Sequence, residues 1–217
     1  MNADPAPIDD LVRLAASGDE ASLAVLFDRH RARLRQMIRL RLDRRLQGRV
    51  DPSDVLQDAY IDLSHKLPEY TSRPALPFFL WLRLVVGERL LRVHRQHLGA
   101  AMRDAGREIS IDQGGAFPQA SSASLAAQLL GRITSASRAV ARVEKQHLLQ
   151  EALNGMEPID REVIALRHFE ELSNDETAEV LGLSKAAASK RYVRAMLRLK
   201  AVVGDNPALQ DPSAGGP

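Results

Sequence analysis

Six basic residues and no acidic residue lie between Lys185 and Lys200, in the segment KAAASKRYVRAMLRLK. Arginine and lysine side chains bind phosphates, and arginine also binds base edges in the major groove of DNA. On a helix with 3.6 residues per turn, four of the basic residues fall on one side together with the small Ala187. The other side carries the residues that we expect to pack: Ala188, Tyr192, Ala195, Met196 and Leu199. The pattern indicates DNA binding, and a basic face that is merely solvated is the alternative.

The residues before this segment predict another helix and a tight turn. Ser173 is placed to cap a helix that ends near Leu181, and Glu176 occupies the position of a capping-box glutamate. Gly182 then provides the backbone freedom that a sharp turn requires, and Ser184 is placed to cap the basic helix. This order is typical of a helix-turn-helix motif, whose second helix enters the major groove.

An acidic strip is expected on the helix that begins after Asp51. Asp51 can cap this helix, Pro52 suits its first position, and the helix is predicted to continue to about Leu67. A loop is expected from Pro68 to Pro77. The outer side of the helix carries the strip: Asp54, Gln57, Asp58 and Asp62. Such a strip is often only solvated, but it also suits a basic partner helix.

A third candidate site lies on the helix predicted to begin at Phe78. Trp81 and Arg92 fall on the side opposite the apolar one, where a tryptophan beside arginines can stack on bases. Trp81 as a core residue is the alternative. His94 and His97 are three residues apart, but the sequence places no third ligand near them, and we expect no metal site.

Composition excludes several classes of protein. The chain has 217 residues, of which 45% are hydrophobic, so it can bury the cores of one or two small domains. It has no cysteine, which excludes disulfides and thiolate metal sites. The acidic start is unlike a secretory signal, and the most apolar window, 78–86, is too short to span a bilayer. These two features favour a soluble cytoplasmic protein. Because the common catalytic motifs are absent, we also expect that the protein is not an enzyme and needs no cofactor.

The elements that must position these residues are all predicted to be helical, which gives an all-α fold class. Residues 99–142 are rich in Ser, Ala, Gly and Gln and indicate a flexible linker that is partly helical at most. We therefore expect two small helical domains, 8–98 and 143–203, of which the second contains the helix-turn-helix. Residues 204–217 are expected to be a disordered tail.

Three segments in this order resemble the sigma-70 family of RNA polymerase sigma factors, in its small extracytoplasmic-function (ECF) group. They are DPSDVLQDAYIDL, FFLWLRLVVGERLLRVHRQ and the C-terminal stretch from EPIDREV to LRLK. The resemblance implies a sigma factor that binds core RNA polymerase and directs promoter-specific initiation at −10 and −35 elements. It implies core polymerase and promoter DNA as partners, no membrane, and an anti-sigma factor as a partner typical of the group.

The resemblance also implies a role for each candidate residue. It assigns docking on the clamp helices of the largest polymerase subunit to Asp54, Gln57 and Asp58. It assigns recognition and melting of the −10 element to Trp81, Arg83, Arg89, Arg92 and Arg95. It assigns recognition of the −35 element to Lys185, Ala187, Lys190, Arg191, Arg194 and Arg198.

Two other functions fit parts of the sequence. A stand-alone helix-turn-helix transcriptional regulator would bind duplex DNA without polymerase, but it has no evident use for the acidic strip. A structural or adaptor bundle would carry both charged surfaces incidentally. A promoter-specific transcription assay with core polymerase separates these functions from that of a sigma factor.

Overall fold

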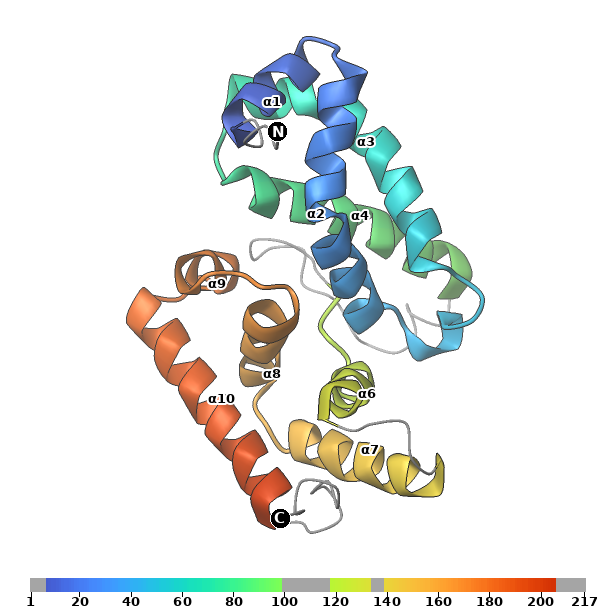
Figure 1. Ribbon diagram of the computed structural model, residues 1–217, viewed down its shortest axis with the longest axis vertical. Coiled ribbons are helices and arrows are strands. Elements are labelled where there is room, and N and C mark those ends of the chain that lie inside the picture. The colour runs from blue at the N-terminus through green and yellow to red at the C-terminus, as the bar shows by residue number, and fades with distance from the viewer. Residues whose placement is uncertain (1–6, 99–117, 134–138, 206–217) are drawn as a thin grey trace, which may run out of the picture. The chain divides into compact units, whose positions relative to one another are not determined.

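The computed structural model of the protein describes residues 7–98, 118–133 and 139–205. Within these ranges the chain forms helices joined by short connections and contains no strand, as the sequence predicts for an all-α protein. The chain divides into two compact units, Met1–Pro118 and Gln119–Pro217. Figure 1 shows the helices in chain order, coloured from blue to red.

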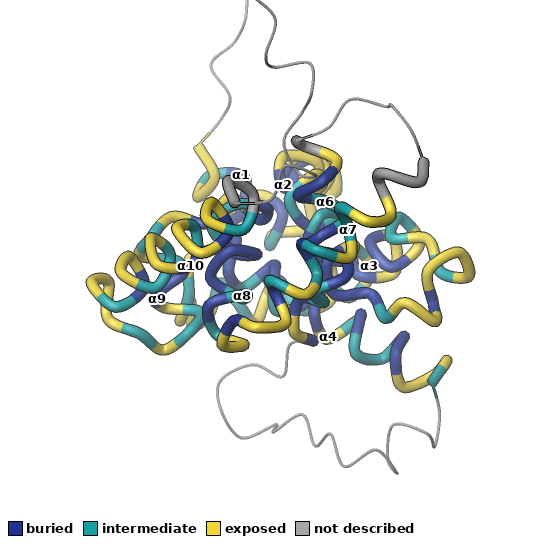
Figure 2. The backbone as a smooth tube through the Cα atoms, turned by 90° about the horizontal axis from the view of Figure 1, so that it is seen from below, coloured by how far each residue is buried: buried dark blue, intermediate teal, exposed yellow. Residues whose placement is uncertain are grey.

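The first unit contains four α-helices in its described residues. They are α1 (Ile8–Ala16), α2 (Glu20–Arg41), α3 (Pro52–Ser72) and α4 (Phe78–Leu98), with a 3₁₀ turn at Arg44–Leu46 between α2 and α3. α1 packs on α2 and α3, which both pack on α4. Leucines at helical spacing fill the core, and six of them are completely buried: Leu26, Leu34, Leu40, Leu63, Leu82 and Leu90. Figure 2 shows the buried positions in dark blue.

Two helix starts in this unit are capped by aspartate side chains, and the one at Asp51 follows the sequence prediction. The Asp19 side chain accepts a hydrogen bond from the backbone N–H of Ser22 and caps α2. The Asp51 side chain accepts one from the N–H of Ser53 at 2.7 Å and caps α3, with Pro52 in the first position. Both caps satisfy N–H groups that have no partner inside the helix.

The predicted end of α3 was wrong, because the helix continues through Pro68 to Ser72. Proline removes one intrahelical hydrogen bond, which usually ends a helix. Here the last turn gains other contacts. The Thr71 hydroxyl donates to the carbonyl of Pro68 at 3.0 Å, and the ring of Tyr70 stacks on that of Trp81 at a centroid distance of 4.5 Å. The connection to α4 is correspondingly short.

The described residues of the second unit form five α-helices: α6 (Ser122–Ile133), α7 (Ala139–Asn154), α8 (Pro158–Ile164), α9 (Asn174–Leu181) and α10 (Lys185–Asp205). A π-helical turn, Ala165–Phe169, continues α8. α6 packs on α7, and α10 packs on α7, α8 and α9. The core includes Leu125, Leu153, Ile164, Leu166 and Ala195, all completely buried.

Part of the segment 99–142, expected to be a linker that is partly helical at most, forms a packed helix. The second part of this segment contains α6, in which Leu125 and Ala126 are completely buried and Leu130 almost so. These positions have helical spacing, but the surrounding Ser, Ala and Gln residues made the segment look unstructured. Residues 99–117 and 134–138 lie outside the described part of the chain. So do residues 206–217 of the expected tail, whereas α10 extends to Asp205.

None of the helices in the described part of the chain combines the length and the apolar character that crossing a bilayer needs.

Candidate nucleic-acid interface

The helix-turn-helix predicted from the sequence is present, with its local geometry intact. The Ser173 hydroxyl accepts from the N–H of Glu176 at 3.1 Å, and the Glu176 carboxylate accepts from the N–H of Ser173 at 2.7 Å. This reciprocal pair is a capping box. Gly182 ends α9 in the left-handed conformation, with φ 61° and ψ 33°. The Asn174 side chain donates to the carbonyl of Lys185 at 2.9 Å and connects the starts of the two helices.

α10 has a packed side and an exposed side. The N–H of Ala187 donates to the Ser184 hydroxyl at 3.2 Å at the start of the helix, as a capping serine requires. The predicted packing residues all lie inward: Ala188, Ala195 and Leu199 are buried, and Tyr192 and Met196 are half-buried. The exposed side is not purely cationic, because Val193 and Leu197 are 53% and 61% exposed.

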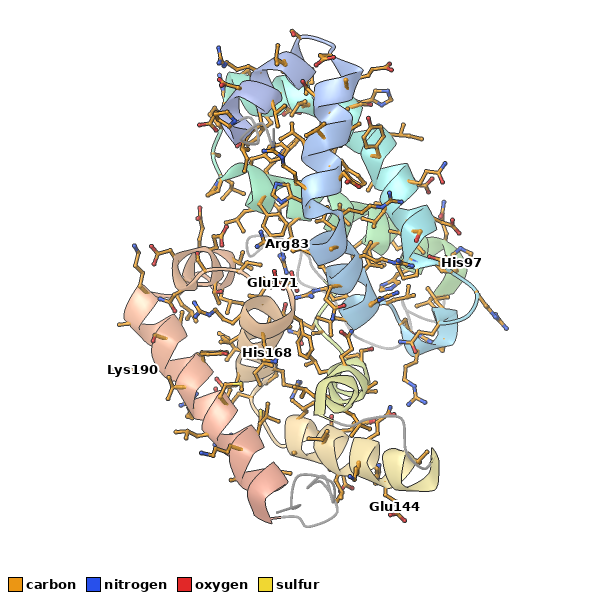
Figure 3. The ribbon with its side chains drawn as sticks, viewed as in Figure 1. Arg83, His97, Glu144, His168, Glu171 and Lys190 are labelled. Carbon is orange, nitrogen blue, oxygen red and sulfur yellow. The ribbon has the colours of Figure 1, made fainter. Side chains whose placement is uncertain are left out.

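The six residues assigned to the −35 element differ in their surroundings. Lys190, labelled in Figure 3, and Arg198 are exposed, and neither has an acidic partner within the described part of the chain. Lys185 is exposed and forms an ion pair with Asp175 at 2.7 Å. Ala187 is half-buried. The remaining two, Arg191 and Arg194, are both held by acidic side chains of the second unit.

Those two arginines converge on Asp160, a residue of α8 whose side chain is completely buried. Arg191 Nη1 donates to Asp160 Oδ1 at 2.8 Å and to Glu157 Oε2 at 2.8 Å. Arg194 Nη2 donates to the two carboxylate oxygens of Asp160 at 3.1 and 3.0 Å. Burial raises the pKa of the Asp160 carboxyl group, but these hydrogen bonds outweigh burial and lower it below its usual value. The carboxylate is therefore ionised at neutral pH. No local pattern of residues indicates this pairing.

The acidic strip of α3 is only partly as predicted. Asp54, Gln57 and Asp58 are all exposed, and Ile61, one turn further along, is 52% exposed. Ile61 was missed because a single apolar residue between two packed positions looks like part of the core. Asp62 was wrongly assigned to the strip. Its side chain is only 14% exposed and faces α4.

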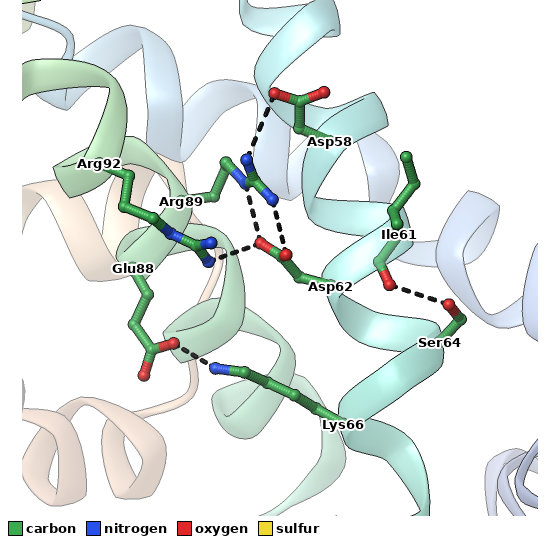
Figure 4. A network of polar contacts seen from close by, with 8 residues as sticks. All are labelled: Asp58, Ile61, Asp62, Ser64, Lys66, Glu88, Arg89 and Arg92. Atoms are coloured by element: carbon green, nitrogen blue, oxygen red, sulfur yellow. Dashed lines mark hydrogen bonds and ion pairs between the residues drawn. The ribbon is translucent and has the colours of Figure 1, made fainter. Parts of the chain in front are cut away.

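Asp62 is the centre of the polar network shown in Figure 4. Arg89 Nε and Nη2 donate to its two carboxylate oxygens at 2.8 and 2.6 Å, and Arg92 Nη2 donates at 2.7 Å. Asp58 lies 3.5 Å from Arg89, and Lys66 pairs with Glu88 beside this group. Burial raises the pKa of Asp62, but the two arginines outweigh it and lower the pKa overall. Arg89 and Arg92 thus join α3 to α4.

Trp81 lies in an aromatic cluster. It is half-buried and stacks on Tyr70 with an interplanar angle of 25°, and its ring centroid is 5.9 Å from that of Phe78. The Tyr70 hydroxyl donates to the carbonyl of Leu76 at 3.0 Å. Tyr70 therefore covers one face of the indole. The sequence did not suggest this role for Tyr70, because it lies in a segment that was expected to be a loop.

The other residues assigned to the −10 element, and the nearby histidines, have distinct environments. Arg83 is 2% exposed, so a contact with DNA would require it to be uncovered, whereas Arg95 is exposed. His94 is buried and accepts a hydrogen bond from the N–H of Asp43 at its Nε2. Burial lowers the pKa of His94, which keeps the ring neutral at pH 7. His97 is exposed.

The chain is similar to a curated sigma factor along most of its length, and its C-terminal part matches a family model. The family model described as "Sigma-70, region 4" matches residues 146–199. The RNA polymerase sigma factor NccH of Alcaligenes xylosoxydans xylosoxydans is 29% identical over 206 residues, which cover 92% of this chain and 96% of NccH. The RNA polymerase sigma-E factor of Streptomyces antibioticus is 40% identical over 67 residues, 28% of this chain and 37% of that protein.

Among solved structures, the fold is similar to that of CnrH, determined in complex with the cytosolic domain of CnrY. The TM-score is 0.54 at 24% sequence identity, and the match covers 92% of this chain and 99% of CnrH. At this identity the likeness concerns the fold of the chain.

Proposed function

This chain belongs to the sigma-70 family of RNA polymerase sigma factors, in the ECF group, and we propose how its two units share the work of a sigma factor. A sigma factor binds core RNA polymerase and directs promoter-specific transcription initiation. It acts by binding and not by catalysis, and its place of action is the cytoplasm, where the polymerase and the chromosome are. The proposal concerns the surfaces that carry out this binding.

The second unit recognises the −35 element through α10. The observation that carries this proposal is the capped α9, the left-handed Gly182 and the cationic exposed side of α10, all within the segment that matches region 4. In this arrangement the first turns of α10 face base edges, where Ala187 leaves room for close approach. Lys190 and Arg198 contact phosphates, because their charges have no acidic partner within the described residues.

The first unit binds the polymerase through α3. Asp54, Gln57 and Asp58 form an exposed acidic surface that suits the basic clamp helices of the largest subunit. Ile61 extends this surface with an apolar side chain, which loses exposed area when a partner covers it. A stand-alone DNA-binding regulator would have no use for this combination.

The −10 element meets the first unit at α4 and the aromatic cluster before it. Trp81 offers one face to an unstacked base, since Tyr70 covers the other face. Arg95 and the exposed part of Arg92 supply positive charge for the DNA backbone. Arg89 contributes mainly by holding α4 on α3, and Arg83 contributes once it is uncovered.

A protein partner that controls the sigma factor completes the proposal. CnrH, which has a similar fold, was determined together with the cytosolic domain of CnrY. We propose that an anti-sigma protein likewise binds this chain and limits its access to the polymerase.

The docking surface is tested by reversing one charge on α3. Asp54→Arg is preferable to a change at Asp58, because Asp58 also lies near Arg89, whereas Asp54 has no ion-pair partner among the described residues. We expect Asp54→Arg to lose co-purification with core polymerase, because an added arginine repels the basic clamp helices.

The matched control is Asp28→Arg, which reverses another exposed charge, on α2, and should leave co-purification intact. Thermal unfolding of both variants checks that the fold persists. Retention of the polymerase by a folded Asp54→Arg protein would exclude the α3 surface as the docking site.

A further inference from the structure

Asp160 divides the cations of α10 into two classes. Arg191 and Arg194, three residues apart on the helix, both donate to its buried carboxylate, and Glu157 lies 2.8 Å from Arg191. Two guanidinium groups and two carboxylates therefore form a cluster with no net charge. Lys190 and Arg198 lie beside this cluster on the same helix without an acidic partner in the described ranges.

This division affects the two components of DNA binding differently. Sequence-independent affinity increases with each uncompensated cation that reaches a phosphate, whereas sequence preference comes from contacts to base edges. An arginine that is already paired with a carboxylate releases little free energy when it meets a phosphate. Pairing Arg191 and Arg194 inside the unit therefore lowers affinity for any DNA without removing the base contacts made by the start of α10.

The same pairs fix the orientation of α10. Asp160 lies in the first turn of α8, and its side chain spans the contact between α8 and α10. Because the carboxylate is fully buried and accepts hydrogen bonds from two positions of α10, rotation of this helix about its axis would break at least one of them. A recognition helix held at one rotation presents the same side chains to every site.

We propose that Asp160 is a positioning residue that sets the sequence specificity of the second unit. It neutralises Arg191 and Arg194, which suppresses binding to unrelated DNA, and it holds α10 so that the first turns of the helix face the base edges. This inference rests on the proposed role of α10 in recognising the −35 element.

The test is Asp160→Asn in the full-length chain. Binding is measured over a range of salt concentrations to two short duplexes, one with the −35 sequence of a promoter found by start-site mapping and one with that sequence scrambled. We expect the plot of log affinity against log salt to become steeper by about 0.9 for each arginine released. The ratio of the two affinities should fall, because the scrambled duplex gains more than the cognate one.

A purely structural role for Asp160 gives a different result. A loosened fold would weaken binding to both duplexes without a steeper salt dependence. An unchanged slope together with an unchanged affinity ratio, in a variant that still unfolds cooperatively, would overturn the proposal. In the double variant Asp160→Asn, Arg194→Gln the slope should return toward the wild-type value by about 0.9, because the cation that lost its main partner is removed.

A second variant keeps the test valid if Asp160→Asn does not fold. Glu157 is 60% exposed, so Glu157→Gln removes one of the two acids at Arg191 without disturbing the core. We expect the slope of log affinity against log salt to be steeper than that of the wild type but less steep than that of Asp160→Asn. Glu144→Gln on α7 makes the same change in net charge at an exposed position and is the matched control. Equal slopes for Glu157→Gln and Glu144→Gln would contradict a local effect.

Failure of this inference can be distinguished from failure of the proposed function. If the wild-type chain bound neither duplex in a salt-dependent way, the assignment of α10 to DNA would fall together with the role of Asp160. If the wild type prefers the −35 duplex but the acidic variants behave like the control, only the role of Asp160 is excluded.

Discussion

Two aspartates in different units have the same relation to arginines of a candidate DNA-binding helix. Asp62 accepts hydrogen bonds from Arg89 and Arg92, and Asp160 accepts them from Arg191 and Arg194. In both cases the arginines are three residues apart and so lie on the same side of their helix. Each aspartate thereby turns part of a cationic surface into a contact between helices.

Asp62 should be important for the stability of the first unit. Asp62→Asn removes the charge that pairs with both arginines, in a position where the side chain is only 14% exposed. We expect the free energy of unfolding to fall by about 1–3 kcal/mol, as is usual when charge-assisted hydrogen bonds are lost. Urea denaturation followed by circular dichroism measures this change.

The control for that measurement is Asp54→Asn on the same helix. Because Asp54 is exposed, Asp54→Asn should change the free energy of unfolding by no more than about 0.5 kcal/mol. A small additional loss comes from removing a favourable negative charge near the start of α3. If Asp62→Asn were no more destabilising than this control, the network of Figure 4 would not hold α3 on α4.

At the scale of single residues, the sequence predicts exposure better than pairing. Residue types and spacing correctly placed Asp54, Gln57 and Asp58 on the surface of α3, since helical periodicity alone decides which side they occupy. They failed for Asp62 and Asp160, whose partners come from another helix. Which arginine an aspartate meets depends on how helices pack, and no local pattern carries that information.

The turn between α9 and α10 depends on a backbone conformation that side chains disfavour. Gly182 has φ 61°, and an added Cβ would meet no atom within 4 Å. Gly182→Ala should therefore destabilise the second unit by about 1 kcal/mol through backbone strain and not through a clash. Thermal unfolding of the purified chain measures the effect.

Gly131→Ala provides a closely matched comparison. Gly131 lies in α6 and does not have a positive φ. A Cβ added there would likewise meet no atom within 4 Å. The same substitution should be neutral or stabilising by up to about 1 kcal/mol, because alanine favours a helix. Equal effects at both positions would mean that the left-handed turn is not important for stability.

Helix starts were predicted more accurately than helix ends. Capping is local: the capping residue and the N–H groups it satisfies are only a few residues apart, so Asp51 and Ser173 could be identified from the sequence. The continuation of α3 through Pro68 depends on the contact between Tyr70 and Trp81, and α6 is stabilised by packing on α7. Both are tertiary contacts, which explains why the sequence alone predicted neither the last turn of α3 nor the packed helix α6.

At the scale of the whole molecule, opposite charges are placed on different units. The first unit presents an acidic surface on α3, and the second presents the uncompensated Lys190 and Arg198 on α10. A net charge of only +2 conceals this separation. Such an arrangement suits a factor that binds a basic protein surface with one unit and DNA with the other.

The most direct test of the account is the mapping of transcription start sites with purified core polymerase, with and without the chain. The account predicts a set of start sites that appears only when the chain is added and that shares −10 and −35 sequences. Asp54→Arg should abolish this set. Identical start sites with and without the chain would contradict the account.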